Sequence, residues 1–209
     1  MKAMLSNGAR DAWVLAVFSL GFTALMAGAY WLTRDTVLRN EAESRAQMVA
    51  QALPAGSFDN DLLADSRPLS QADSYKLGME DIAHVYLAKQ GGQIKAAVVE
   101  AIAPDGYAGQ IKLLVAVGRD GRTQGVRVVA HKETPGLGDY IDAAKSDWIL
   151  QFEGKSLLQP LPERWKVKKD GGRFDSVAGA TVTPRAVIKA VRKAAVYVAE
   201  NRETLFASQ

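Results

Sequence analysis

The sequence predicts an α+β domain carried on a single N-terminal transmembrane helix. Three observations support this fold class: an uncharged apolar run at 12–33, a series of β-rich runs between short turns at 84–131, and an amphipathic helical pattern near the C-terminus. Strands joined by short turns pair antiparallel. Helices that follow such strands usually cover one face of the sheet. We therefore expect one membrane helix, followed by an antiparallel sheet with packed helices.

The composition is that of a folded globular protein and excludes several kinds of site. The chain has 209 residues, of which 48% are apolar and 23% charged. It has no Cys, which excludes disulfides, iron–sulfur clusters on thiolates and Cys nucleophiles. Its two His, His84 and His131, are far apart in sequence, so no metal site is expected. The net charge of +3 is mild. One predicted helix carries a basic stripe, but the stripe lacks interleaved aromatics, so nucleic acid is not an expected partner; the stripe consists of Arg185, Lys189, Arg192 and Lys193.

The apolar run at 12–33 is long enough to cross a membrane. At about 1.5 Å per residue it spans about 33 Å as a helix, against a hydrocarbon core of about 30 Å. Trp13, Tyr30 and Trp31 lie at its ends, as in an interfacial aromatic belt. A cleaved signal peptide has a shorter apolar region, and a buried core helix would contain polar breaks, so a retained anchor is the preferred interpretation. Basic residues are balanced on the two sides, and charge alone leaves the orientation open.

The elements expected after the anchor come in a simple order. Helical spacing continues over 34–53 and stops at Pro54, and 55–80 is mostly loop. Strands are expected at 84–89, 94–103, 110–118 and 123–131, with turns at 90–93, 104–106 and 119–122. The expected organisation is a tail at 1–11, the membrane helix at 12–33, a region of helical stalk, loop and first strand at 34–89, and a domain at 90–209.

The C-terminal third is predicted to contain short helical segments, one further strand and a long helix. Helical or turn-like segments are expected at 139–146 and 147–152, and a strand at 165–168. Thr183 is the expected cap of the last helix, because Pro184 suits a first turn. An apolar stripe on this helix faces the core and comprises Ala186, Val187, Ala190, Val191, Ala194 and Val198.

Two motifs are candidates for chemistry. Asp175–Pro184 places two hydroxyls and a glycine directly before a helix, whose free N–H groups suit a phosphate. The simpler interpretation of this motif is an ordinary helix cap. The second motif, at 131–138, is a loop with the sequence HKETPGLG, in which Glu133 and Thr134 offer polar groups. This loop is equally compatible with a surface Ω-loop.

Together these motifs resemble the FMN-binding domain of covalently flavinylated electron-transport subunits. That family includes the G subunit of the Rnf complex and the C subunit of the sodium-pumping NADH:quinone reductase, and length favours the former. The family pattern is an Asp, two variable residues, Ser or Thr, then Gly-Ala-Thr, another residue, and Ser or Thr. Here it runs from Asp175 to Thr183, with Ala178 where the family usually has Ser or Thr. The block from Gly106 through Gly138 also matches, and the resemblance covers roughly residues 90–200.

The resemblance implies a covalent flavin site within 90–209. Thr181 would carry FMN through a phosphodiester, attached by a flavin transferase that recognises Asp175. The loop at 131–138 would pack against the flavin ring. The residues implied at the cofactor are Ser176, Ala178, Gly179, Ala180, Val182 and Thr183 from one motif and Glu133, Thr134, Gly136, Leu137 and Gly138 from the other. Lys168 and Lys169 could offset the phosphate charge, although solvated lysines are the simpler interpretation.

The same resemblance implies a role and a location. The chain would relay electrons within an ion-translocating ferredoxin:NAD oxidoreductase, as a redox subunit that is not catalytic alone. Other membrane and redox subunits would be its partners, since no Gly-rich dinucleotide fingerprint is present. The anchor would lie in the cytoplasmic (inner) membrane of a bacterium or archaeon, with the flavin domain on the periplasmic side. The alternatives are a component like the C subunit of a sodium-pumping reductase, a tethered binding or assembly protein with unmodified Thr181, and a secreted flavoprotein whose N-terminal segment is removed.

Overall fold

The computed structural model describes residues 2–207 and divides into two compact units that meet between Arg45 and Ala46. The first unit consists of most of one helix, α1 (Lys2–Gln51). This helix continues without a break from the apolar run into the predicted stalk. Its side chains over 12–33 are all exposed, and by length and composition the helix can cross a membrane. The helix ends just before Pro54, as predicted. The predicted domain boundary at 89/90 stays a prediction.

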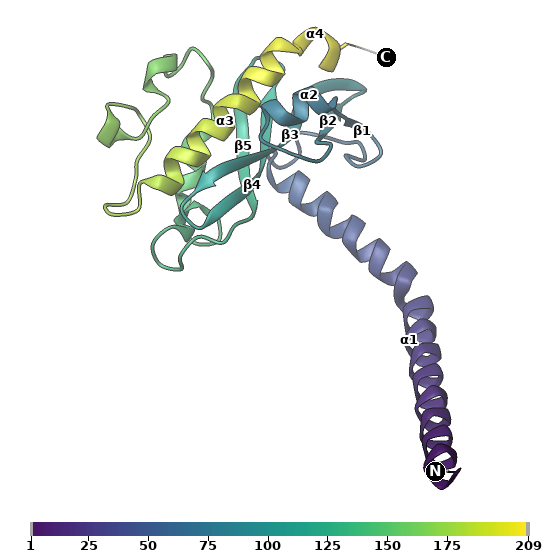
Figure 1. Ribbon diagram of the computed structural model, residues 1–209. Helices are drawn as coiled ribbons and strands as arrows, with labels where there is room; N and C mark the ends of the chain where they lie inside the picture. Colours follow the sequence, from purple (N-terminus) through teal and green to yellow (C-terminus); the bar gives the residue numbers. More distant parts are fainter. Residues whose placement is uncertain (1, 208–209) are drawn as a thin grey trace. The chain divides into compact units, whose positions relative to one another are not determined.

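A five-stranded antiparallel sheet forms the centre of the second unit, and its strands lie in the order β1-β2-β3-β4-β5 (Figure 1). Each strand pairs with its neighbours in sequence, as expected for a meander. The bounds are β1 (Ser66–Pro68), β2 (His84–Gln90), β3 (Gln93–Gly106), β4 (Gly109–Gly118) and β5 (Thr123–Ala130).

Both faces of the central strands are buried, which explains their nearly continuous apolar sequence. Alternate side chains enter two separate cores. In β4, Leu113 and Val115 face the larger core, whereas Leu114 and Ala116 face the smaller one. The smaller core is completed by the end of α1 and the segment after it, through Val49, Ala52, Leu53 and Leu62.

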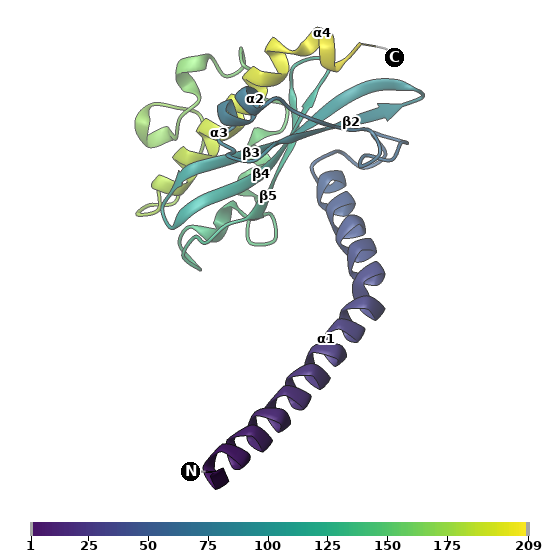
Figure 2. The ribbon, with the colours of Figure 1, turned by 45° about the vertical axis from the view of Figure 1, so that its right-hand side comes forward.

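The larger core is covered by the C-terminal helix α3 (Val182–Glu200), which lies across β3 and β4 (Figures 1 and 2). The predicted apolar stripe of α3 is buried throughout. Shorter helices complete the unit: α2 (Gln71–Lys76), α4 (Arg202–Leu205) and the 3-10 turns η1 (Asp139–Ile141), η2 (Asp147–Phe152), η3 (Pro162–Arg164) and η4 (Lys168–Asp170). The fold class is the one predicted from the sequence.

Two local predictions are wrong. The turn expected at 104–106 is the end of β3, and the chain reverses at Tyr107 and Ala108 instead. Pro104 is tolerated there because β2 no longer pairs with this end of β3, so no ladder donor is lost. The segment 165–168 is not a strand. Val167 makes an isolated β-bridge to Phe174, and the chain enters η4 at Lys168, so no ladder of strand pairing extends along the segment.

Candidate functional site

The loop at 131–138 ends in a tight turn. The carbonyl of Thr134 accepts hydrogen bonds from the backbone N–H groups of Leu137 (3.1 Å) and Gly138 (2.9 Å). Gly136 has a φ of 76°, which is a left-handed conformation that favours glycine. Its N–H donates to Asp139 Oδ1 at 2.7 Å. The turn therefore has a fixed shape and leaves the Leu137 side chain 54% exposed.

Glu133 belongs to the same loop and its side chain is buried, only 4% exposed. Its Oε1 accepts from the N–H of Ala108 at 3.1 Å, and its Oε2 accepts from the hydroxyl of Thr183. The carboxylate thus joins three segments: the β3–β4 turn, the 131–138 loop and the first turn of α3. A direct contact of Glu133 with a cofactor stays a prediction.

Two glycines make room for the Glu133 carboxylate. A Cβ on Gly138 would lie 2.8 Å from Glu133 Oε2, and one on Gly106 would lie 2.9 Å from Glu133 Oε1 and 2.3 Å from the carbonyl oxygen of Gly109. Contacts this short force neighbouring atoms to move. The glycines at these two positions are therefore explained by packing around a buried acid.

Two aromatic residues donate hydrogen bonds to the backbone of the loop that precedes α3. Trp148 Nε1 donates to the carbonyl of Asp175 at 2.7 Å, and the hydroxyl of Tyr140 donates to the carbonyl of Ala180 at 3.1 Å. The two rings meet edge to face, 5.5 Å apart. Partial burial raises the pKa of Tyr140, so its hydroxyl stays protonated and able to donate. Gly179 completes the loop with a φ of 84°.

The helix begins two residues earlier than predicted, which changes the roles of the two threonines. Thr181, not Thr183, occupies the N-cap position, and its hydroxyl makes no capping hydrogen bond. Thr183 lies inside the first turn and is 2% exposed, because its hydroxyl is bound to the buried Glu133. Among the described residues, the hydroxyl of Thr181 has one partner, Arg185 Nη1, at 3.4 Å. Of the two threonines, Thr181 is therefore the one whose hydroxyl the fold leaves partly accessible.

Two ion pairs involve residues of the loop before α3 or of the first turns of α3. Lys168 Nζ lies 2.5 Å from Asp175 Oδ1. Arg185 donates from Nε and Nη2 to the two carboxylate oxygens of Asp170, at 2.7 and 2.8 Å. The bound guanidinium holds the pKa of Asp170 below its usual value, so this pair is charged at neutral pH.

The segments that carry the two motifs present exposed apolar side chains, and the start of α3 presents groups that suit an anion. Leu137 in the 131–138 loop, Val177 in the loop before α3 and Val182 at the start of α3 are 54%, 45% and 43% exposed. The first N–H groups of α3 and Arg185 suit an anion. Within residues 2–207, no group of three or more His, Cys, Asp and Glu side chains is placed so that it could hold a metal ion.

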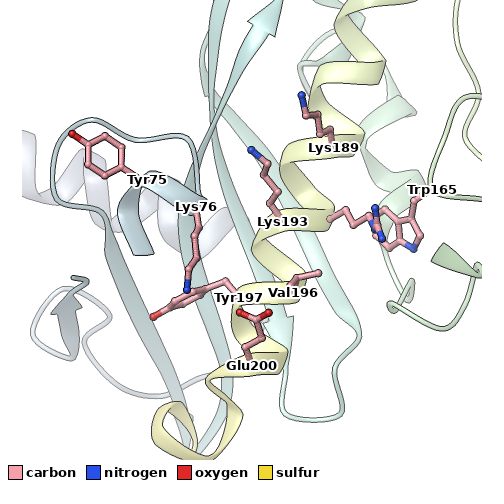
Figure 3. Close-up of a pocket in the computed structure, with 9 residues that line it drawn as sticks. Tyr75, Lys76, Trp165, Lys189, Lys193, Val196, Tyr197 and Glu200 are labelled. Carbon is pink, nitrogen blue, oxygen red and sulfur yellow. The ribbon is translucent and has the colours of Figure 1, made fainter. Parts of the chain in front are cut away.

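A separate groove lies between α2 and α3 and is not part of this site (Figure 3). It has a volume of about 730 Å³, and its lining includes Lys76, Lys189, Lys193 and Glu200. No residue of the loops 131–138 or 175–183 lines it. Lys189 forms an ion pair with Asp105 at 2.9 Å. The residues of the predicted basic stripe therefore lie in two places. Arg185 contacts Thr181, whereas Lys189 and Lys193 line this groove.

The residues that fix the loop before α3 lie outside both sequence motifs and could not be identified from them. Tyr140, Trp148 and Gln151 anchor the 175–181 loop from segments predicted only as helical or turn-like. Asp170 and Arg185 pair across 15 positions of sequence. The sequence gives no signal for these contacts, because each depends on the tertiary packing of irregular segments.

Comparison with known proteins agrees with this geometry. The FMN-binding domain family matches residues 106–196, which include both loops and most of α3. The RnfG N-terminal region matches residues 1–52, which include α1.

Relatives that are similar over nearly the full length are named as the G subunit of an ion-translocating oxidoreductase complex. The relative from Vibrio atlanticus is 45% identical over 98% of this chain and 96% of its own length. Relatives from Pseudomonas aeruginosa and Vibrio cholerae are 48% and 43% identical, over 96% and 97% of this chain and 92% and 95% of their own lengths. On the strength of this similarity and the two matching regions, the chain belongs to the family of G subunits of ion-translocating oxidoreductase complexes.

Proposed function

We propose that this chain is a membrane-anchored electron carrier of an ion-translocating ferredoxin:NAD oxidoreductase complex, with FMN attached covalently to Thr181. The observation that carries the covalent assignment is the state of the Thr181 hydroxyl. It occupies an N-cap position, where a threonine oxygen usually accepts a backbone hydrogen bond, yet it makes none. The neighbouring Thr183 is buried and already bonded to Glu133, which leaves Thr181 as the acceptor that a modifying enzyme can reach.

The attachment needs an activated flavin and a transferase. The oxygen of the Thr181 hydroxyl would form a bond to the flavin phosphorus while the phosphoanhydride bond of a flavin dinucleotide breaks. A nucleoside monophosphate leaves, and the hydroxyl proton is released to solvent. Asp175 is 58% exposed in its side chain and sits at the start of the loop, so it is available for recognition by the transferase.

Once attached, FMN would supply one- and two-electron transfer, while the chain supplies position and electrostatics. Glu133 fixes the 131–138 loop against α3, and Tyr140 fixes the carbonyl end of the 175–181 loop. Leu137, Val177 and Val182 offer apolar contact to the ring. The phosphate would lie near the first N–H groups of α3, where the helix dipole favours negative charge.

The anchor and the family membership support the rest of the proposal. Helix α1 would hold the flavin near other membrane subunits, to which it passes electrons and from which it receives them. We place the flavin domain on the periplasmic side, as the resemblance to the family implies. The balanced charges allow this, because a long following domain can translocate regardless of its charge. A covalent cofactor suits a compartment without a supply of FMN. Reactivity of residues at 46–209 toward a membrane-impermeant label in intact cells would test this orientation.

The covalent assignment is tested on the full chain, purified in detergent from cells that contain the flavin transferase. We expect flavin fluorescence to migrate with the denatured chain, and the peptide that contains Thr181 to gain the mass of FMN less water. Thr181→Ala is expected to abolish both signals, and Thr183→Ser is the matched control that keeps the buried hydroxyl. An unmodified wild-type peptide would favour a tethered binding or assembly protein instead.

A further inference from the structure

We propose that Arg185, oriented by Asp170, is the counter-ion that holds the phosphate of a flavin attached at Thr181. The inference rests on the proposed function, since it requires a flavin phosphate on that hydroxyl. It assigns a role to a side chain outside both sequence motifs, and it gives Asp170 the role of a positioning residue.

The position of Arg185 relative to the hydroxyl is the first argument. Arg185 lies one helical turn after Thr181, and its Nη1 is 3.4 Å from Thr181 Oγ1. A phosphorus esterified to that oxygen would be one bond further out, with its free oxygens in reach of the same guanidinium. A guanidinium carries five N–H donors in a planar fork that matches phosphate oxygens.

The second argument is how Asp170 holds the guanidinium. Its carboxylate accepts from Nε and Nη2 at 2.7 and 2.8 Å, so it uses one edge of the fork. This two-point contact fixes the plane of the group and leaves the Nη1 donors directed toward Thr181. The Arg185 side chain is 43% exposed, so an incoming phosphate can reach it.

The charge balance is the third argument. The single negative charge of Asp170 is paired with Arg185 and also lies within the electrostatic influence of Lys166 and Lys169. Cations therefore outnumber the carboxylate around Asp170. A phosphodiester brings one negative charge, which would offset part of this surplus. The unmodified site is electrostatically prepared for an anion.

The competing explanation is that the Arg185–Asp170 pair only ties η4 to α3. The two explanations can be distinguished by experiment, because the ion pair can be removed by changing either Arg185 or Asp170. Arg185→Gln and Asp170→Asn both remove the ion pair, so a purely structural role predicts the same effect for both. Only Arg185→Gln removes the phosphate partner, whereas Asp170→Asn leaves the cation free to bind the phosphate.

The experiment measures the ³¹P NMR resonance of the attached flavin in full-length protein, in a phosphorus-free detergent. The fluorescence anisotropy of the flavin is recorded on the same samples. For Arg185→Gln we expect a displaced resonance and lower anisotropy. For Asp170→Asn we expect a smaller change in the same direction, because the cation remains but has lost the carboxylate that orients it. Lys189→Gln is the matched control, because it removes a cation of the same helix that also pairs with a distant aspartate, Asp105. Arg185→Lys is expected to restore the resonance only in part, since an ammonium lacks the fork.

Each outcome bears on a different step. A wild-type Thr181 peptide without FMN would overturn the proposed function and this inference together. A loaded wild type with an unchanged resonance in Arg185→Gln would overturn the inference alone, as would equal changes in Arg185→Gln and Asp170→Asn. If Arg185→Gln carries no flavin, Arg185→Lys is measured in its place, and a resonance identical to the wild type's would overturn the inference.

Discussion

The hydrogen bond between the buried Glu133 and Thr183 offers a quantitative test of the site's framework. Thr183→Val keeps the shape of the side chain but removes the donor to Glu133 Oε2. Glu133→Gln keeps an acceptor for the N–H of Ala108, which Oε1 holds at 3.1 Å, but replaces the charged acceptor that faces Thr183. A hydrogen bond to a charged group contributes about 1.5–3 kcal/mol, and we expect each single change to lower the free energy of unfolding by about that amount.

The two changes should not add, because they remove the same interaction. A double-mutant cycle is therefore expected to give a coupling of about 1.5 kcal/mol or more. The assay is denaturant unfolding of the full chain in detergent, followed by the fluorescence of the buried Trp148 and Trp165. Thr181→Val is the matched control. It makes the same chemical change where the hydroxyl does not cap the helix, and its effect should stay within about 0.5 kcal/mol. A coupling below about 0.5 kcal/mol would refute the claim that Glu133 joins the loop to α3.

Three further predictions follow from the same contacts. Gly138→Ala places a Cβ 2.8 Å from a buried carboxylate oxygen and should lower the free energy of unfolding by about 1–3 kcal/mol. Gly136→Ala meets open space and should lower it by about 1–2 kcal/mol, because an alanine is strained at a φ of 76°. Thermal unfolding by circular dichroism measures both, and an unchanged midpoint for Gly138→Ala would contradict the packing argument. Tyr140→Phe should cost about 1 kcal/mol and speed amide exchange in the 175–181 loop, which hydrogen-exchange mass spectrometry would detect. The pKa of Asp170 is held below 3.8, so its ion pair stabilises the fold above that pH and is lost as the pH falls through the lower folded value. The stability difference between wild type and Asp170→Asn should therefore shrink between pH 5 and pH 2, and a constant difference would argue against this contribution.

The strands could be predicted because their local signals agree with the fold. The turns at 90–93 and 119–122 join runs of β-formers, and pairing between sequence neighbours needs no long-range information. The turn at 104–106 was misplaced because Pro-Asp-Gly is a strong turn signal in isolation. In the fold, the end of β3 lies beyond the end of β2, which removes the usual objection to a strand proline.

The candidate site was only partly predictable, for a related reason. The resemblance brought the loops 131–138 and 175–183 together, and the fold places them against the same end of α3. The roles of the two threonines depend on Glu133, which lies 50 positions away from its partner. Thr183 looks like a cap when only its neighbour Pro184 is considered. Its burial follows from a tertiary contact that local spacing does not reveal.

The last turn of α1 belongs to the second unit, and this has a practical consequence for anyone who wishes to separate the domain from its anchor. Val49, Ala52 and Leu53 are buried against the sheet face that contains Tyr86, Val98 and Leu114. Cleavage after Arg45 would release a domain that keeps its own cover. Cleavage after Leu53 would remove Val49, Ala52 and Leu53 and expose an apolar sheet face to water. Exposed apolar surface of this kind promotes self-association. A fragment that is cut free of the membrane segment should therefore begin inside α1, at Ala46, so that it keeps the residues that cover this sheet face.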